Sequence, residues 1–180
     1  MKLAYADPPY LGCCGLYDHH HPDGLCWDDL ATHEALIGRL TDDYPDGWAL
    51  SATSGSLRHL LPLCPDDVRV GAWVKPFASF KPNVNPAYCW EPVIFHGGRK
   101  RDRTEPTTRD YVAANITLRR GLTGAKPREF CWWVFDLLGA EPADEFHDLF
   151  TGSGAVSEAW DSYRQRERID PASLFAEDVA

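Results

Sequence analysis

The sequence Leu3-Ala4-Tyr5-Ala6-Asp7-Pro8-Pro9-Tyr10, near the start of the chain, is the most informative segment for the architecture. A short apolar run that is cut off by an acid and two prolines is typical of a buried strand with an abrupt end. Each proline has a fixed φ and no N–H group, so the backbone after the run is stiff. We therefore expect a rigid rim at the carboxyl end of a strand, where open α/β sheets bind their ligands. This rim carries the Asp7 carboxylate and the Tyr10 ring.

A second informative stretch, Asp148-Leu149-Phe150-Thr151-Gly152-Ser153-Gly154, lies near the other end of the chain. It follows Glu145-Phe146-His147 and precedes an apolar segment that begins at Ala155, a pattern that predicts a strand, a glycine turn and a helix. Two glycines around a small hydroxyl allow backbone N–H groups to approach a ligand closely at a helix N-terminus. The stretch is therefore a candidate ligand-binding loop. The alternative is a simple tight turn, which the flanking Phe150 and Ser153 disfavour.

A third motif, Lys126-Pro127, opens a predicted helix whose apolar residues are Phe130, Trp133, Val134, Leu137 and Leu138. The order Asp-Pro-Pro-Tyr, Lys-Pro, glycine loop resembles that of the β-class amino-methyltransferases, which transfer methyl groups from S-adenosylmethionine to adenine N6 or cytosine N4 of DNA. The resemblance spans roughly residues 3–166. Leu149 departs from the family pattern, which has a proline at that position.

The resemblance assigns candidate roles to the motif residues. Asp7 and the Pro8 carbonyl would accept hydrogen bonds from the target amine, and Tyr10 would stack on a base that has been flipped out of a duplex. The implied catalytic residues are Asp7, Pro8, Pro9 and Tyr10, and the implied cofactor-binding residues are Asp7, Lys126, Asp148, Phe150, Gly152, Ser153 and Gly154.

Two alternatives to a DNA adenine methyltransferase stay open at this point. Aspartate rather than serine before Pro-Pro favours adenine N6, whereas related Asp-Pro-Pro-Trp motifs serve RNA adenosine. A catalytically inactive nucleic-acid-binding subunit with the same fold is the alternative from another class. Taken alone, Asp7 before prolines would be a turn cap, and Tyr10 would be a core aromatic residue.

The alternation of apolar runs with helical periods predicts an α/β, Rossmann-like sheet that is mostly parallel, with helices on both faces. We expect about five strands, near residues 3, 48, 69, 92 and 146, and a short helix around 111–114. Helices are also expected after Asp28 or Asp29, over 56–63, after Lys126-Pro127 and up to about residue 166. The family sheet normally has seven strands, and the missing pair, one of which carries an acid for the cofactor ribose, would follow the glycine loop.

Length and composition favour one methyltransferase domain over 1–166 and a tail over 167–180, because 180 residues with 44% hydrophobic content suit a single core. The sequence has no apolar run that would span a membrane and no secretory leader. Six irregularly spaced cysteines favour a cytoplasmic protein. Cys13, Cys14, His19, His20, His21 and Cys26 do not match zinc-ligand spacing, so we expect no metal. We expect the loop that contains these residues to close over the target base or the cofactor.

Basic residues concentrate in one segment of a chain whose net charge is −9. Residues 99–128 contain nine lysines and arginines against three acids. Such a patch is typical of phosphate contacts, although an isolated charge run is more often a solvated loop. We predict a target-recognition insert over 96–126. Because this insert is short, sequence specificity would come from a dimer partner or from the loop between Cys13 and Cys26. A homodimer is therefore one expected assembly. The candidate nucleic-acid-binding residues are Arg99, Lys100, Arg101, Arg103, Arg109, Arg119 and Arg120.

Overall fold

The structure is a computed structural model that describes residues 1–13, 27–77, 84–116 and 125–166. Its described part contains a six-stranded sheet with the order β5-β3-β4-β2-β1-β6. The strands are β1 (Lys2–Ala6), β2 (Gly47–Ser51), β3 (Arg69–Val74), β4 (Trp90–Gly97), β5 (Tyr111–Ala113) and β6 (Glu145–Asp148). All five strands expected from the sequence are present.

The sheet is mostly parallel, as expected. β1 pairs in parallel with β2 and with β6, and β3 pairs in parallel with β5. β4 is the reversed strand, because it pairs antiparallel with both β2 and β3. The carboxyl ends of the other five strands therefore lie at one edge of the sheet, which we call the carboxyl edge.

The sixth strand, β5, corrects the expectation of a short helix around 111–114. Tyr111 pairs with Ala72 of β3, and the Ala114 N–H donates to the Val74 carbonyl over 3.0 Å. Three residues are too few to show a period, so sequence cannot distinguish a strand from a helical turn. The free edge of β3 supplies the hydrogen-bond partners that decide the conformation.

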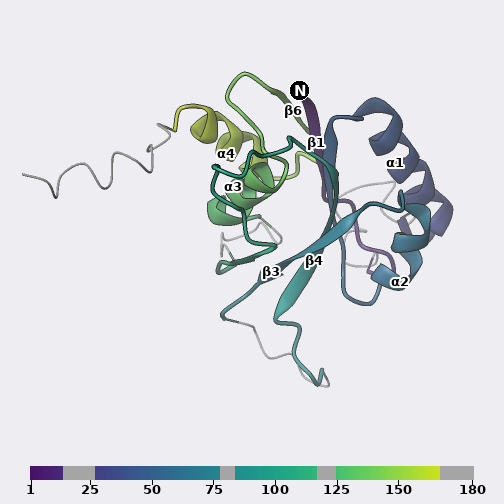
Figure 1. Ribbon diagram of the computed structural model, residues 1–180. Helices are drawn as coiled ribbons and strands as arrows, with labels where there is room; N and C mark the ends of the chain where they lie inside the picture. Colours follow the sequence, from purple (N-terminus) through teal and green to yellow (C-terminus); the bar gives the residue numbers. More distant parts are fainter. Residues whose placement is uncertain (14–26, 78–83, 117–124, 167–180) are drawn as a thin grey trace, which may run out of the picture.

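Helices cover both faces of the sheet, which confirms the predicted layering (Figure 1). On one face α3 (Arg128–Leu137) and α4 (Ala155–Arg164) pack against Leu3 and Tyr5 of β1. On the other face α1 (Leu30–Asp43) and α2 (Leu57–Leu60) pack against Ala4 and Ala6. The alternation of side chains along β1 therefore feeds both cores.

Two helix boundaries show how the chain reaches these positions. Asp29 caps α1, since its carboxylate accepts a hydrogen bond from the Ala31 N–H over 3.0 Å. The helix expected over 56–63 is instead divided into α2 and a 3₁₀ turn, η3 (Leu61–Leu63), at the point where Pro62 lacks an N–H donor.

The predicted insert is described in part, and the predicted C-terminal tail is not described. Residues 167–180, the predicted tail, lie outside the described residues. The predicted insert over 96–126 contributes the end of β4 and all of β5, so part of it belongs to the sheet. In the described part of the chain no helix is long and apolar enough to cross a membrane.

Candidate active site

Asp7 follows directly after β1, at the carboxyl edge, and its carboxylate is partly buried. The Lys126 ammonium lies 2.9 Å from Asp7 Oδ1, and the Tyr10 hydroxyl donates to the same oxygen over 3.0 Å. Lys126 also donates to the Tyr10 hydroxyl over 3.1 Å. The structure thus brings Lys126 of one motif together with Asp7 and Tyr10 of another, more than a hundred residues away in sequence.

Lys126 is the most buried charge of this group, with 7% of its side chain exposed. Burial alone would lower the pKa of its ammonium, but the negative charges of Asp7 and Glu91 outweigh burial and hold the pKa above its usual value. The ammonium also lies 5.5 Å from the Trp73 ring centroid and 5.7 Å from that of Phe130. Lys126 is therefore a fixed positive charge at neutral pH.

Glu91 is a site residue that the sequence motifs do not select. Its Oε2 lies 3.2 Å from the Tyr10 hydroxyl, whose single proton it shares with Asp7, and 3.7 Å from Lys126 Nζ, while Oε1 pairs with Lys75. The sequence contains one signal for it. In β4, Val93 and Phe95 face the α3–α4 core, and Glu91 is an acid at the next position on that same face. Lys75, which follows β3, is paired with this acid.

The glycine loop begins beside Asp7, because β6 pairs with β1 in a register that sets Asp148 opposite Tyr5. The Leu149 N–H donates to the Tyr5 carbonyl over 3.0 Å. A proline at this position, as in the family pattern, has no N–H to donate. The leucine therefore adds one hydrogen bond that extends the pairing of β1 and β6 by a residue.

The Asp148 carboxylate is turned partly inward at the start of the loop. Burial raises the pKa of this carboxyl, the hydrogen bond from the Phe150 N–H lowers it in part, and the nearby Asp7 carboxylate raises it further, so that the pKa lies above its usual value. Asp148 Oδ2 is buried and has no hydrogen-bond partner within the described ranges. An unsatisfied buried oxygen at this position is an acceptor available to a ligand.

Both loop glycines have left-handed backbone conformations, with φ of 42° at Gly152 and 76° at Gly154. A Cβ built on Gly152 would come no closer than 3.6 Å to its nearest neighbour, the Phe150 carbonyl, and one on Gly154 would meet nothing within 4 Å. Glycine is therefore required by the backbone angle and not by crowding within the chain. The space around the loop is open, and α4 begins directly after it.

The sheet topology predicts where a ligand-binding crevice lies. β1 and β6 are adjacent parallel strands, and the helices that follow them, α1 and α4, lie on opposite faces of the sheet. Open α/β sheets bind ligands at such a point, outside the carboxyl ends of the strands. Asp7 and the glycine loop are the residues at that point. Phe150 packs there against Trp27, with ring centroids 5.2 Å apart.

The basic segment begins at the opposite edge of the sheet. Because β4 is reversed, Arg99 follows it at the amino ends of β1 and β2. Arg99 makes a bidentate contact with Asp144, over 2.8 and 2.9 Å, and the Met1 ammonium lies 2.6 Å from the same carboxylate. Arg101 donates to the backbone carbonyls of Pro106 and Asp136. The structure therefore does not bring Arg99 or Arg101 together with Asp7.

The remaining predicted nucleic-acid contacts are less constrained. Lys100 and Arg103 are exposed, and Arg109 donates to the Tyr111 hydroxyl over 3.3 Å. Arg119 and Arg120 lie outside the described residues. So do Cys14, His19, His20, His21 and Cys26. In the part of the chain that is described, no group of three or more His, Cys, Asp or Glu side chains is placed to hold a metal ion.

Arg99→Ala is expected to destabilise the fold, because it removes both hydrogen bonds to Asp144, whose side chain is 4% exposed. The expected loss is about 1–2 kcal/mol of unfolding free energy by urea denaturation, reduced by the partial exposure of the guanidinium. Arg103→Ala, an exposed arginine of the same segment, is the control and should change stability by no more than about 0.5 kcal/mol. Equal stability of the two variants would contradict a structural role for Arg99.

The fold is shared with solved structures. The chain is similar to the crystal structure of the M1.HpyAVI–SAM complex, with a TM-score of 0.61 and 13% sequence identity over 92% of this chain and 78% of that chain. It is similar to a second crystal structure, of M1.HpyAVI, with a TM-score of 0.59 and 14% identity over 91% of this chain and 77% of that chain. No protein-family model matches the sequence, and no curated protein matches it either. The similarity confirms the Rossmann-like methyltransferase fold.

Proposed function

We propose that the protein transfers a methyl group from S-adenosylmethionine to the exocyclic amine of a DNA base, with adenine N6 as the target. The observation that carries this proposal is the juxtaposition of Asp7 and the glycine loop on adjacent parallel strands, in a register that sets Asp148 beside Tyr5. The SAM complex among the similar structures supports the choice of cofactor.

The chemistry requires an acceptor next to a weak nucleophile. The lone pair of the exocyclic amine is delocalised into the ring, and it becomes available only as the nitrogen moves toward tetrahedral geometry. The nitrogen would then form a bond to the methyl carbon while the carbon–sulfur bond breaks, its electron pair staying on the sulfur as a neutral thioether, and the proton of the nitrogen would pass to water. An anionic acceptor stabilises the positive charge that develops on nitrogen in that transition state.

Asp7 is suited to this task, because Lys126 and Tyr10 both contact Oδ1. In our proposal Oδ2 and the Pro8 carbonyl accept the hydrogen bonds of the target amine, Pro9 stiffens the rim, and the Tyr10 ring stacks on the base. Lys126 would then orient Asp7. Asp148, Phe150, Gly152, Ser153 and Gly154 would hold the cofactor, with backbone N–H groups of the loop facing its charged end.

The decisive experiment combines calorimetry with a transfer assay. Titration with S-adenosylmethionine measures cofactor binding, and radiolabelled methyl transfer to DNA and to RNA, followed by mass spectrometry of the nucleosides, identifies the modified base. We expect N6-methyladenine in DNA. Detection of N4-methylcytosine or of methylated RNA would change the assigned substrate to cytosine or to RNA. The absence of methyl transfer despite tight cofactor binding would overturn the proposed reaction.

A binding subunit without turnover is favoured by one observation. Within the described ranges β6 is the edge of the sheet, so no strand beyond it supplies the acid that would hold the cofactor ribose. The calorimetric arm distinguishes the two functions, because a subunit that has lost its cofactor pocket binds DNA but not S-adenosylmethionine.

Gly152→Val is expected to abolish measurable binding of S-adenosylmethionine while the protein remains folded. The valine would have to adopt a φ near the 42° of Gly152 and would fill the open space at the loop. The backbone strain should cost about 1–2 kcal/mol of stability. Gly38→Val on α1, where a Cβ meets nothing within 4 Å, is the control and should bind the cofactor normally. Unchanged affinity of Gly152→Val would make the loop a simple turn.

Nucleic-acid contacts of the basic segment remain a prediction. Arg99 and Arg101 have structural partners, so we propose that Lys100, Arg103, Arg109, Arg119 and Arg120 supply any phosphate contacts. The log–log slope of DNA affinity against salt measures this contribution, since each lost contact lowers the slope by about 0.9.

A further inference from the structure

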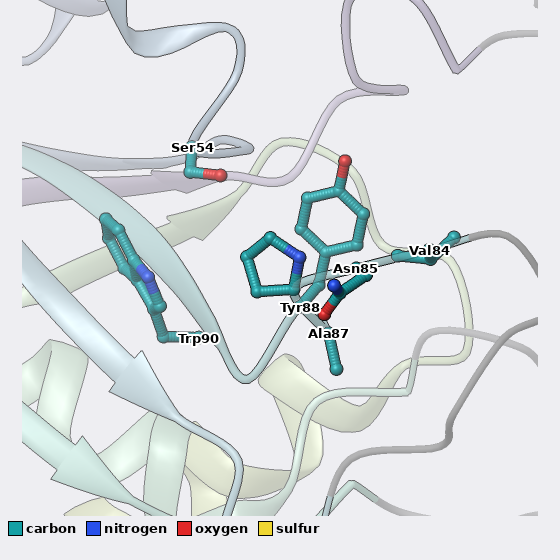
Figure 2. A pocket seen from close by; sticks show the side chains of 7 residues that line it. Ser54, Val84, Asn85, Ala87, Tyr88 and Trp90 are labelled. Atoms are coloured by element: carbon teal, nitrogen blue, oxygen red, sulfur yellow. The ribbon is translucent and has the colours of Figure 1, made fainter.

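A hollow of about 320 Å³ lies at the carboxyl edge, on the other side of β1 from the glycine loop. Its walls come from Ser54, which follows β2, and from the segment that leads into β4, including Asn85, Tyr88 and Trp90. Figure 2 shows Trp90 on one side of the hollow and Tyr88 and Asn85 on the other, with the Ser54 hydroxyl pointing toward the space between them.

The lining has an unusual combination of exposed rings and neutral polar groups. Tyr88 is 68% exposed and Trp90 is 41% exposed, although rings of this size are normally covered in a folded domain. Ser54 and Asn85 add a hydroxyl and an amide, and none of the lining residues carries a charge. In a chain with a net charge of −9, the lining itself therefore presents no carboxylate to a polyanion.

Strand β4 contributes residues both to the hollow and to the candidate active site. Trp90 is the first residue of that strand, and its neighbour Glu91 contacts Tyr10 and Lys126. Only β2 separates β4 from β1, so the strand axes that carry Trp90 and Asp7 are roughly 10 Å apart in the direction of the inter-strand hydrogen bonds. Trp90 and Glu91 are successive residues of the strand, so their side chains project to opposite faces of the sheet. A ligand anchored at Asp7 would therefore reach the hollow by crossing the carboxyl end of β2.

We propose that this hollow binds an unpaired nucleobase that flanks the target base in the same strand. The base would stack on Tyr88 and Trp90, and the Asn85 amide and Ser54 hydroxyl would hydrogen-bond to its edge. Stacking on aromatic side chains is the general means by which proteins hold unpaired bases, and it tolerates any base. The inference rests on the proposed function, and it adds that the preferred substrate is single-stranded or locally opened around the target.

Lys75 supports the orientation of such a strand. It follows β3 at the same edge and is paired with Glu91 of β4, the strand that begins at Trp90. Phe77, 65% exposed, follows two residues later. The β3–β4 side of the edge therefore has three exposed rings beside the Lys75–Glu91 ion pair, while the β6 side has the glycine loop. The cofactor and the nucleic acid would then approach Asp7 from opposite sides.

The test uses the full chain and a fluorescein-labelled single-stranded DNA oligonucleotide that contains adenine. Tyr88→Ala and Trp90→Ala are each expected to raise the Kd measured by anisotropy, and the KM for transfer, by about tenfold. Tyr88→Phe and Trp90→Phe keep an aromatic ring, so their Kd and KM should stay within about twofold of the wild-type values. If the alanine variants were weak only because they misfold, this difference between alanine and phenylalanine would not be expected. Affinity for S-adenosylmethionine and kcat at saturating DNA should not change.

Val70→Ala is the control, because Val70 is 39% exposed but lies near the amino end of β3, away from the hollow. It should leave Kd and KM unchanged. If the wild type methylates DNA and the Tyr88→Ala and Trp90→Ala variants equal it, the hollow is not a base site and the proposed function stands. If the wild type binds S-adenosylmethionine but neither binds nor methylates the oligonucleotide, both the inference and the proposed function fail.

Discussion

Asp7→Asn should lower kcat for methyl transfer by a factor of about 10²–10³ while the affinity for S-adenosylmethionine changes only a few-fold. The amide keeps one oxygen acceptor but loses the negative charge that stabilises the developing cation on the target nitrogen. Removing one preorganised electrostatic partner of a transition state typically costs this much. Single-turnover transfer to an adenine-containing oligonucleotide measures the chemical step, and calorimetry measures the cofactor affinity.

Asp7→Ala should abolish transfer, and it has a second consequence that the amide variant avoids. It removes the carboxylate that lies 2.9 Å from Lys126, so the buried ammonium keeps only Glu91 as an anionic partner in the described site. We expect a further loss of about 1–2 kcal/mol of stability for this reason. Asp29→Asn, at the cap of α1, is a control for the loss of an exposed aspartate and should leave kcat unchanged. Normal turnover by Asp7→Ala would remove Asp7 from the mechanism.

The meeting of Asp7 with the glycine loop was predictable from the sequence, and the reason is geometric. Parallel strands have their carboxyl ends at the same edge of a sheet, so two motifs that each follow a buried strand must lie at that edge. The predicted strands near residues 3 and 146 are neighbours in the structure. Pattern and topology together therefore placed these two parts of the candidate site.

The location of Arg99 was not predictable in the same way. A period of two identifies β4 as a strand but gives no information on its direction. Because β4 is antiparallel to β2, the chain leaves it at the amino ends of β1 and β2, and Arg99 there contacts Asp144. A parallel β4 would have delivered the same residues to the Asp7 edge. The charge pattern alone cannot distinguish the two arrangements.

The position of Glu91 was predictable only in part, less than that of Asp7 and more than that of Arg99. An acid on the inward face of a half-buried strand is costly unless it is paired, so its position predicts a buried cation nearby. Which cation it meets depends on long-range packing, because Lys126 is 35 residues further along the chain. The sequence therefore contained the signal for a charged cluster but not the identity of its members.

Lys126→Met should reduce kcat by about 10²-fold with little change in the affinity for S-adenosylmethionine. In the structure Lys126 Nζ lies 2.9 Å from Asp7 and 3.7 Å from Glu91, so its loss leaves two carboxylates facing each other without their shared cation. Their repulsion should turn Asp7 away from the target amine. The resemblance of the Lys-Pro motif to the family instead makes Lys126 a cofactor residue, and in that case the Kd for S-adenosylmethionine would rise while kcat at saturation would change less.

The double variant Lys126→Met with Glu91→Gln isolates the electrostatic cause. Removing one of the two acids relieves the repulsion, so the double variant should recover a substantial part of the kcat that Lys126→Met loses. The pH dependence adds a second test. The pKa of Lys126 is raised above the ordinary 10.5, so its ammonium persists until the pH rises beyond that value, and its stabilising contribution is complete at lower pH. The kcat of the wild type should therefore show no limb from Lys126 between pH 6 and 9. An alkaline decrease in that range, absent in Lys126→Met, would mean that Lys126 acts as a proton carrier and not as a fixed charge that orients Asp7.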